Sequence, residues 1–200
     1  NNSGNSYFEE QGGNLFTKIS SFKNTKSIDI FADTLIQKDS KFAKCFSEFI
    51  FGFNLKSYTF DKYKTLNNNQ LNEKISIKII TTKRRNIESE YKYYNAIKEG
   101  VFLARNLVSE PPNILNPKKY VEEIKKLSRY GLKVKAYGEK DLKKLGLNAL
   151  LGVGVGSANE SYLATIEWNG NKKAKKKPLA FVGKGVCFDT GGISLKPAKY

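Results

Sequence analysis

Histidine is absent from the 200-residue chain. A Ser-His-Asp triad, a Cys-His pair and a His-Glu-x-x-His zinc site each need an imidazole, so none of them can lie in this segment. Cysteine is scarce: Cys45 and Cys187 are far apart, form no Cys-x-x-Cys motif and suggest no disulfide framework. We therefore expect the reducing conditions of an intracellular protein.

Long apolar runs and methionine are also missing. No stretch of about 18 apolar residues occurs and no signal-peptide pattern opens the chain, so we expect a cytoplasmic protein with no membrane partner. The lack of methionine, even at position 1, leads to the hypothesis that the chain is an interior piece of a longer polypeptide.

Acidic residues are few relative to basic ones. The chain has 35 lysines and arginines against 19 aspartates and glutamates, a formal net charge of +16. Such a charge could attract nucleic acid, which makes a DNA-binding accessory protein the alternative function. The lysines are nevertheless spread along the chain. Their dense cluster at 172–177 predicts a solvated hairpin tip between strands at 162–168 and 178–182. Nucleic acid is therefore at most a secondary partner.

The first part of the chain alternates predicted helices and strands. Residues 1–25 are polar and rich in Gly, Asn and Ser, which predicts a loop, and strands are expected at 27–32 and 75–80. Asp39 is a candidate N-cap for a helix whose core-facing stripe is Phe42, Phe46, Phe49, Ile50 and Phe53. A long helix is expected at 87–108, with one apolar face formed by Tyr94, Ile97, Val101, Ala104 and Val108.

Prolines end this long helix and start the next one. Glu110-Pro-Pro-Asn113 stops the helix because proline cannot continue it. Asn116-Pro117 supplies an N-cap and a proline at the first helical position. A strand at 132–137, a short helix at 140–145 and an extended segment at 149–155 follow.

This alternation of strands and helices predicts the α/β class. We expect residues 1–110 to form a partial amino-terminal α/β domain that ends in a linking helix. Residues 111–200 would then begin a doubly wound α/β catalytic domain.

Two lysines and one aspartate lie on a glycine-rich path after a predicted buried strand. Pro178–Val182 is a short apolar run typical of strands inside parallel sheets, where chemistry is found at the strand ends. Lys184, Asp189 and Lys196 follow it, and the glycines among them let the backbone bring these side chains toward one point. A lysine beside an apolar strand needs a partner, because burying an unpaired ammonium is costly.

Ordinary structural interpretations stand beside the chemical one. Lys184 and Asp189 could form a loop salt bridge worth under about 1 kcal/mol. Cys187 lies between them and could bind metal as a thiolate, but such a cysteine is more typical of a small core hydrophobe. Gly152–Gly156 lacks the full Gly-x-Gly-x-x-Gly spacing of a nucleotide loop, which favours close backbone packing.

Three blocks in the chain carry a family resemblance. They are Ala104-Arg-Asn-Leu-Val-Ser-Glu-Pro-Pro-Asn113, Leu145–Ser157 with Asn159-Glu-Ser161, and Val182-Gly-Lys-Gly-Val-Cys-Phe-Asp-Thr-Gly-Gly-Ile-Ser-Leu-Lys-Pro197. From about Glu88 onward the chain resembles the leucyl aminopeptidases, the dinuclear-metal cytosol aminopeptidase family. Before that point only Tyr58–Lys64 resembles the family, and more weakly.

The resemblance implies a metal-dependent aminopeptidase that releases amino-terminal residues, preferably leucine, from peptides. It implies that Lys184 binds one metal through its amine, that Asp189 bridges both metals, and that Lys196 is the catalytic cation at the scissile carbonyl. It also implies two divalent ions per subunit, Zn²⁺ or Mn²⁺, and a homo-hexamer. The family's remaining ligands and its catalytic arginine have no counterpart in these residues.

The chemistry of the two lysines agrees with these roles. A lysine binds a metal only as the neutral amine. A second lysine must stay charged to stabilise a developing oxyanion. The two side chains would thus need opposite protonation states, a separation of pKa values that is typical of active sites.

Overall fold

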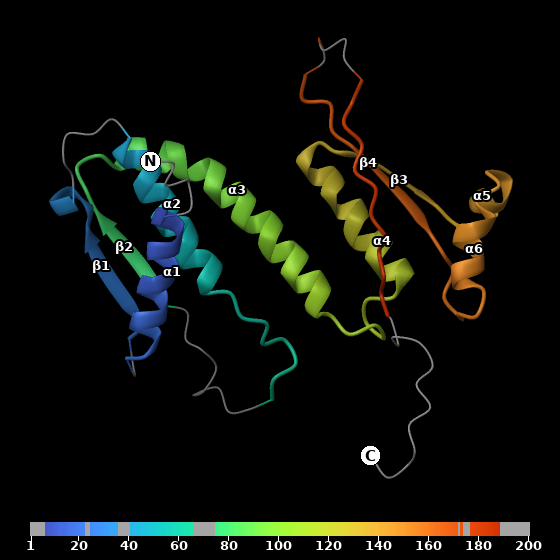
Figure 1. The fold of residues 1–200 in the computed structure, drawn as a ribbon, viewed down its shortest axis with the longest axis horizontal. Helices are drawn as coiled ribbons and strands as arrows, with labels where there is room; N and C mark the ends of the chain where they lie inside the picture. Colours follow the sequence, from blue (N-terminus) through green and yellow to red (C-terminus); the bar gives the residue numbers. More distant parts are fainter. Residues whose placement is uncertain are drawn as a thin grey trace. The chain divides into compact units, whose positions relative to one another are not determined.

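The computed structural model describes residues 7–22, 25–35, 41–65, 75–171, 173 and 177–188. The chain divides into two compact units, Asn1–Ser109 and Glu110–Tyr200 (Figure 1). Each unit contains both helices and strands, so the predicted mixed α/β content is confirmed. The assignment of the units to an amino-terminal domain and to the start of a catalytic domain stays a prediction.

The first unit combines helices with a parallel pair of strands. Its elements are α1 (Tyr7–Ser20), β1 (Ser27–Phe31), the 3-10 helix η1 (Ala32–Leu35), α2 (Phe42–Lys56), β2 (Ser76–Ile80) and α3 (Arg84–Ser109). β1 and β2 run parallel, with Ile28 opposite Ile77 and Ile30 opposite Ile79. The predicted strands and the long helix are therefore confirmed.

The aromatic stripe of α2 forms the core of this unit. Phe46 and Ile50 are about nine-tenths buried or more and pack with Ala32 and Ile87. The buried hydroxyl of Ser47 donates to the carbonyl of Ala43 at 2.7 Å and lies 3.4 Å from that of Ile87, so it links α2 to α3.

The start of α2 differs from the predicted one. Lys41 holds the N-cap position without a side-chain hydrogen bond, so the prediction of Asp39 as N-cap is wrong. Asp39 itself lies outside the described residues. The rings of Phe42 and Phe46 stack with their centroids 5.6 Å apart. The first turn of α2 therefore shows aromatic packing and no side-chain cap from Lys41.

Only part of the apolar face predicted for α3 is buried. The hydroxyl of Tyr94 donates a hydrogen bond to Glu48 on α2 at 2.8 Å. Burial raises the pKa of the Tyr94 phenol, and the bond to Glu48 raises it further. Val108, at the far end of this face, is 87% exposed. There the loop after α2 meets a different face, because Tyr58 packs on Phe102 and donates to Asn106 at 2.8 Å.

The loop predicted for residues 1–25 is wrong, because residues 7–20 form the helix α1. α1 crosses α2 with its backbone in contact at two glycines. A Cβ atom on Gly12 would lie 1.9 Å from the carbonyl oxygen of Phe49, and one on Gly52 would lie 1.8 Å from that of Glu9. The glycines that favoured a loop in the sequence thus permit a close helix crossing.

The second unit contains an antiparallel pair of strands. Its elements are α4 (Pro117–Lys126), the 3-10 helix η2 (Leu127–Tyr130), β3 (Lys133–Tyr137), α5 (Glu139–Lys144), α6 (Asn148–Gly154) and β4 (Leu163–Glu167). β3 pairs with β4, with Val134 opposite Ile166. The strands predicted at 132–137 and 162–168 and the short helix at 140–145 are confirmed.

Two expectations for this unit are wrong. The extended segment predicted at 149–155 is the helix α6, since its small and apolar residues accommodate either conformation. Residues 178–182 form no strand, and Phe181 and Val182 are 94% and 98% exposed. Neither β3 nor β4 pairs with this run, so the hairpin expected around 172–177 is absent from the described residues. The doubly wound sheet stays a prediction.

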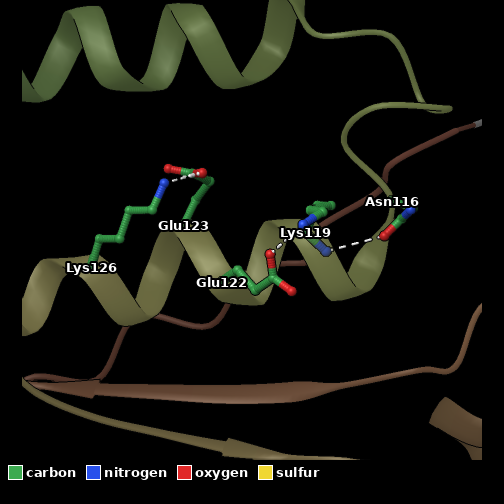
Figure 2. A network of polar contacts seen from close by, with 5 residues as sticks. All are labelled: Asn116, Lys119, Glu122, Glu123 and Lys126. Atoms are coloured by element: carbon green, nitrogen blue, oxygen red, sulfur yellow. Dashed lines mark hydrogen bonds and ion pairs between the residues drawn. The ribbon is translucent and has the colours of Figure 1, made fainter.

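The amino-terminal end of α4 is fixed by its predicted cap (Figure 2). The side-chain oxygen of Asn116 accepts the backbone N–H of Lys119 at 3.1 Å, and Pro117 follows the cap. The same view shows two ion pairs along the helix, Lys119–Glu122 at 2.7 Å and Lys126–Glu123 at 2.5 Å. Because both pairs are exposed, the cap contributes more to the helix than they do.

Replacing Gly12 by alanine should destabilise the first unit, because the added methyl meets backbone atoms that cannot rotate away. Overpacking of this kind costs about 1–3 kcal/mol. Gly100→Ala in α3 is the matched control, since nothing lies within 4 Å of its added Cβ. It should gain about 0.5–1 kcal/mol from helix propensity alone. Urea unfolding of the full-length protein, with hydrogen exchange of the α1 amides, measures both effects. Equal midpoints for the two variants would refute the close crossing.

Candidate active site

A cleft of about 870 Å³ lies within the second unit. Four short segments wall it: the loop into α4, the helix α6, the loop that leads to β4, and the segment 184–188. Its apolar side chains come mainly from α6 and from the end of the last segment, namely Ala149, Leu150, Val153, Val186 and Phe188. The arrangement is an open, largely apolar hollow whose lining also includes polar residues.

Lys184 lines this cleft and is exposed to solvent. Its carbonyl oxygen accepts the N–H of Val186 at 3.1 Å, which closes a tight turn centred on Gly185. Lys184 makes no ion pair with a carboxylate among the residues that the structure describes. The side chain is therefore open to a ligand in the cleft.

The other two predicted site residues cannot be compared with the structure. Asp189 and Lys196 lie outside the described residues, so only Lys184 of the three is placed. Within the described ranges, no group of three or more cysteine, aspartate or glutamate side chains is arranged to hold a metal ion. The metal site remains the one that the Lys184–Lys196 block predicts.

Cys187 also lines the cleft, and its side chain is partly buried. Its thiol lies 3.9 Å from the carbonyl oxygen of Gly185, a weak contact within the same turn. Burial raises the pKa of the Cys187 thiol, so it is uncharged at neutral pH. These features favour the interpretation of Cys187 as a small packing residue.

The glycine-rich run at 152–156 contributes a packing contact to the cleft wall. A Cβ atom on Gly154 would lie 2.0 Å from the hydroxyl oxygen of Ser161. Gly152 and Gly156 have nothing within 4 Å of such an atom. Close backbone packing therefore accounts for one of the three glycines, and it holds the loop before β4 against α6.

Several lining residues were not singled out as site candidates by the sequence. Asn113 and Asn159 both line the cleft, and the backbone N–H of Asn159 donates to the hydroxyl of Ser157 at 3.0 Å. The N–H of Ser161 donates to the carboxylate of Glu139 at 3.2 Å, which ties the loop before β4 to the start of α5. A signal for them was present, because Asn113 and Asn159 belong to two of the three blocks that carried the resemblance.

Helices in the described part of the chain are all too short or too polar to span a bilayer. The lysine cluster at 172–177 is described only at Lys173 and Lys177, so its surface cannot be compared with the predicted hairpin tip.

Comparison with known proteins identifies relatives over nearly the whole chain. The model of the cytosol aminopeptidase family, catalytic domain, matches residues 102–200. A protein of Brucella ovis described as a probable cytosol aminopeptidase is 42% identical over 200 residues, which cover 98% of this chain and 39% of the relative. Proteins of the same description from Agrobacterium fabrum and Phytoplasma mali are 44% and 43% identical, and cover 90% and 89% of this chain and 36% of each relative.

Solved structures agree with this relationship. A mutant of tomato leucine aminopeptidase superposes with a TM-score of 0.75 at 25% identity, covering 92% of this chain and 37% of that one. The bottromycin maturation enzyme BotP in complex with Mn superposes with a TM-score of 0.61 at 23% identity, covering 80% and 33%, a likeness of fold alone.

The chain spans 36–40% of the length of the curated relatives that it matches. The block that contains Lys184 lies inside the region matched by the catalytic-domain model, and the identity extends across both units. The chain belongs to the cytosol aminopeptidase family.

Proposed function

We propose that the protein containing this chain is a metal-dependent aminopeptidase that hydrolyses amino-terminal residues, preferably leucine, from peptides. The observation that carries the proposal is the position of Lys184, which lines an open cleft inside the region that the catalytic-domain model matches. The second unit would form the start of a doubly wound α/β catalytic domain. A homo-hexamer and a cytoplasmic location are part of the same proposal.

The donor chemistry near Lys184 suits two divalent metal ions. An amine nitrogen from Lys184 and a carboxylate from Asp189 are ligands that Zn²⁺ and Mn²⁺ accept. The cleft offers room beside Lys184, and this amine has no competing carboxylate among the described residues. A similar fold, BotP, is described in complex with Mn. When bound, a pair of such ions supplies an activated water and polarises the scissile carbonyl.

The chain's own residues divide the remaining work. Lys184 would have to give up its proton to act as a ligand, and Asp189 would contribute a negative charge that offsets the charge of the cations. Lys196 keeps its proton and places a positive charge where the carbonyl oxygen becomes negative during attack. Such a charge acts in the transition state and therefore raises turnover more than substrate affinity.

The apolar wall of the cleft supports a preference for aliphatic side chains. Leu150 and Val153 from α6 face the same hollow as Lys184, together with Pro112 and Phe188. Burying an aliphatic side chain of leucine size against such a wall stabilises a complex by about 1.5–3 kcal/mol. Asn113 and Asn159 also line the cleft, and an asparagine amide can both donate to and accept from a peptide backbone.

Substituting Lys184 by arginine separates the metal role from the salt-bridge role. An arginine keeps the positive charge for a salt bridge but cannot lose its proton, so it cannot bind a metal. In the full-length protein, Lys184→Arg should lower the metal content below two ions per subunit, measured by elemental mass spectrometry after dialysis. Lys177→Arg, on the same segment, is the control and should keep full metal content. Full metal content in both variants would favour the salt bridge.

Removing the charge of Lys196 should affect turnover without removing metal. Loss of one electrostatic stabiliser of an oxyanion lowers turnover by about 100- to 1,000-fold. Lys196→Ala in the full-length protein should show this loss with a leucyl anilide substrate, while its metal content matches that of the unmodified protein. A variant that retained its full rate would show that another group stabilises the transition state.

DNA binding is the second candidate function, favoured by the net charge of +16. If basic side chains neutralise several phosphates, affinity for duplex DNA should fall by about 1,000-fold between about 50 and about 200 mM salt. Fluorescence anisotropy of a labelled duplex measures this slope. No binding at the lower salt concentration would remove the DNA hypothesis and leave the peptidase proposal unaffected.

A further inference from the structure

Lys184 lies between two glycines that look equivalent in the sequence but differ in the structure. A Cβ atom on Gly183 would have nothing within 4 Å. A Cβ atom on Gly185 would lie 2.6 Å from Cε1 and 3.2 Å from Cδ1 of Tyr120, inside the contact distance of real side chains. The backbone on one side of Lys184 therefore rests against an aromatic ring, and on the other side it is open.

The need for glycine at 185 is steric. Within the described ranges, positive φ angles occur at Gly131 and Gly146, and Gly185 is not among them. The turn closed by the N–H of Val186 and the carbonyl of Lys184 would accept an L-residue by its φ angle. A side chain at position 185 would disrupt the contact between the ring of Tyr120 and the backbone.

Tyr120 is itself held by a fixed element. It lies in the first turn of α4, where its N–H donates to the carbonyl of Asn116 at 2.9 Å. Asn116 caps the helix through Lys119, as Figure 2 shows, and the next residue, Val121, is buried. Rotamers that point back into the preceding turn are rare in a helix, so the ring has few alternative positions.

We infer that Tyr120 is a positioning residue for the metal site. Contact with the Tyr120 ring fixes the position of the backbone at Gly185. This position determines where the amine of the adjacent Lys184 enters the cleft. Supports of this kind, one layer behind the ligand, typically change metal affinity by about 10- to 100-fold when they are removed. The inference rests on the proposed function, because it takes Lys184 to be a metal ligand.

Metal affinity of the full-length apo-protein tests the inference without any activity measurement. Competition with a chelating indicator gives the dissociation constants for Zn²⁺. Gly185→Ala should weaken the binding of one ion by about 10- to 100-fold. Gly183→Ala, the matched control on the open side, should stay within about twofold of the unmodified protein, since its methyl meets nothing. Equal effects of the two substitutions would overturn the inference.

A second residue makes the test specific for the ring. Tyr120→Phe should bind Zn²⁺ as the unmodified protein does, because the contact uses ring carbons and leaves the hydroxyl uninvolved. Tyr120→Ala removes the support and should itself weaken Zn²⁺ binding by about 10- to 100-fold. In Tyr120→Ala/Gly185→Ala the ring is gone and the added methyl no longer clashes, so the double variant should bind Zn²⁺ no more weakly than Tyr120→Ala alone. Purely additive losses in the double variant would contradict the contact.

Metal-free protein supplies a readout that does not depend on Lys184 as a ligand. Cys187 lies two residues after Gly185, so its labelling rate by a thiol reagent, followed on its own peptide by mass spectrometry, reports the position of this segment. Gly183→Ala should keep the rate within the roughly twofold range of a neutral surface substitution, and Gly185→Ala should move it outside that range. An unchanged rate in Gly185→Ala overturns the inference. A changed rate with unaltered Zn²⁺ affinity supports the contact but overturns the positioning role of Tyr120, and the metal role of Lys184 is then decided by Lys184→Arg alone.

Discussion

Both units depend on one constraint, which is that the backbone of one segment closely approaches another segment. Only glycine permits such an approach. In the first unit α1 lies against α2 because Gly12 and Gly52 have no side chains. A helix of 14 residues such as α1 is marginal alone in water, so its stability comes from this contact. In the second unit the same device brings the backbone at Gly185 onto Tyr120. One contact joins two helices, and the other, by our inference, positions the backbone next to Lys184.

Much of the fold could be predicted, because its strands and longer helices follow hydrophobic periodicity and capping rules. Asn116-Pro117 marked the start of α4 because a cap and a proline act within one turn. Two of the misses share one cause: α1 and α6 contain glycines that local rules assign to loops or extended chain. Whether a glycine breaks a helix or lets another helix approach it depends on residues distant in sequence, which local patterns do not contain.

The candidate site could be predicted only in part. Lys184 followed from its motif, and the structure places it on a cleft. The walls of that cleft come from segments up to 76 positions apart, Pro112 at one end and Phe188 at the other. No spacing rule links Leu150 to Lys184, because tertiary packing alone brings them to one hollow. Asn113 and Asn159 could have been found only by treating the resembling blocks as parts of one site.

If Lys184 binds a metal, as proposed, its place on irregular chain raises a physical problem that the second unit resolves. The segment that leads to Lys184 has no strand partner among the described residues, and Val182 just before it is almost fully exposed. Such a segment can adopt many conformations. Binding a metal would restrict it to one of them, and the lost conformational entropy lowers the affinity for the metal. A contact with a capped helix removes part of that freedom before the metal arrives. Tyr120 lies in the first turn of α4, which Asn116 caps. Contact with this helix therefore explains the need for glycine at position 185 better than backbone flexibility does.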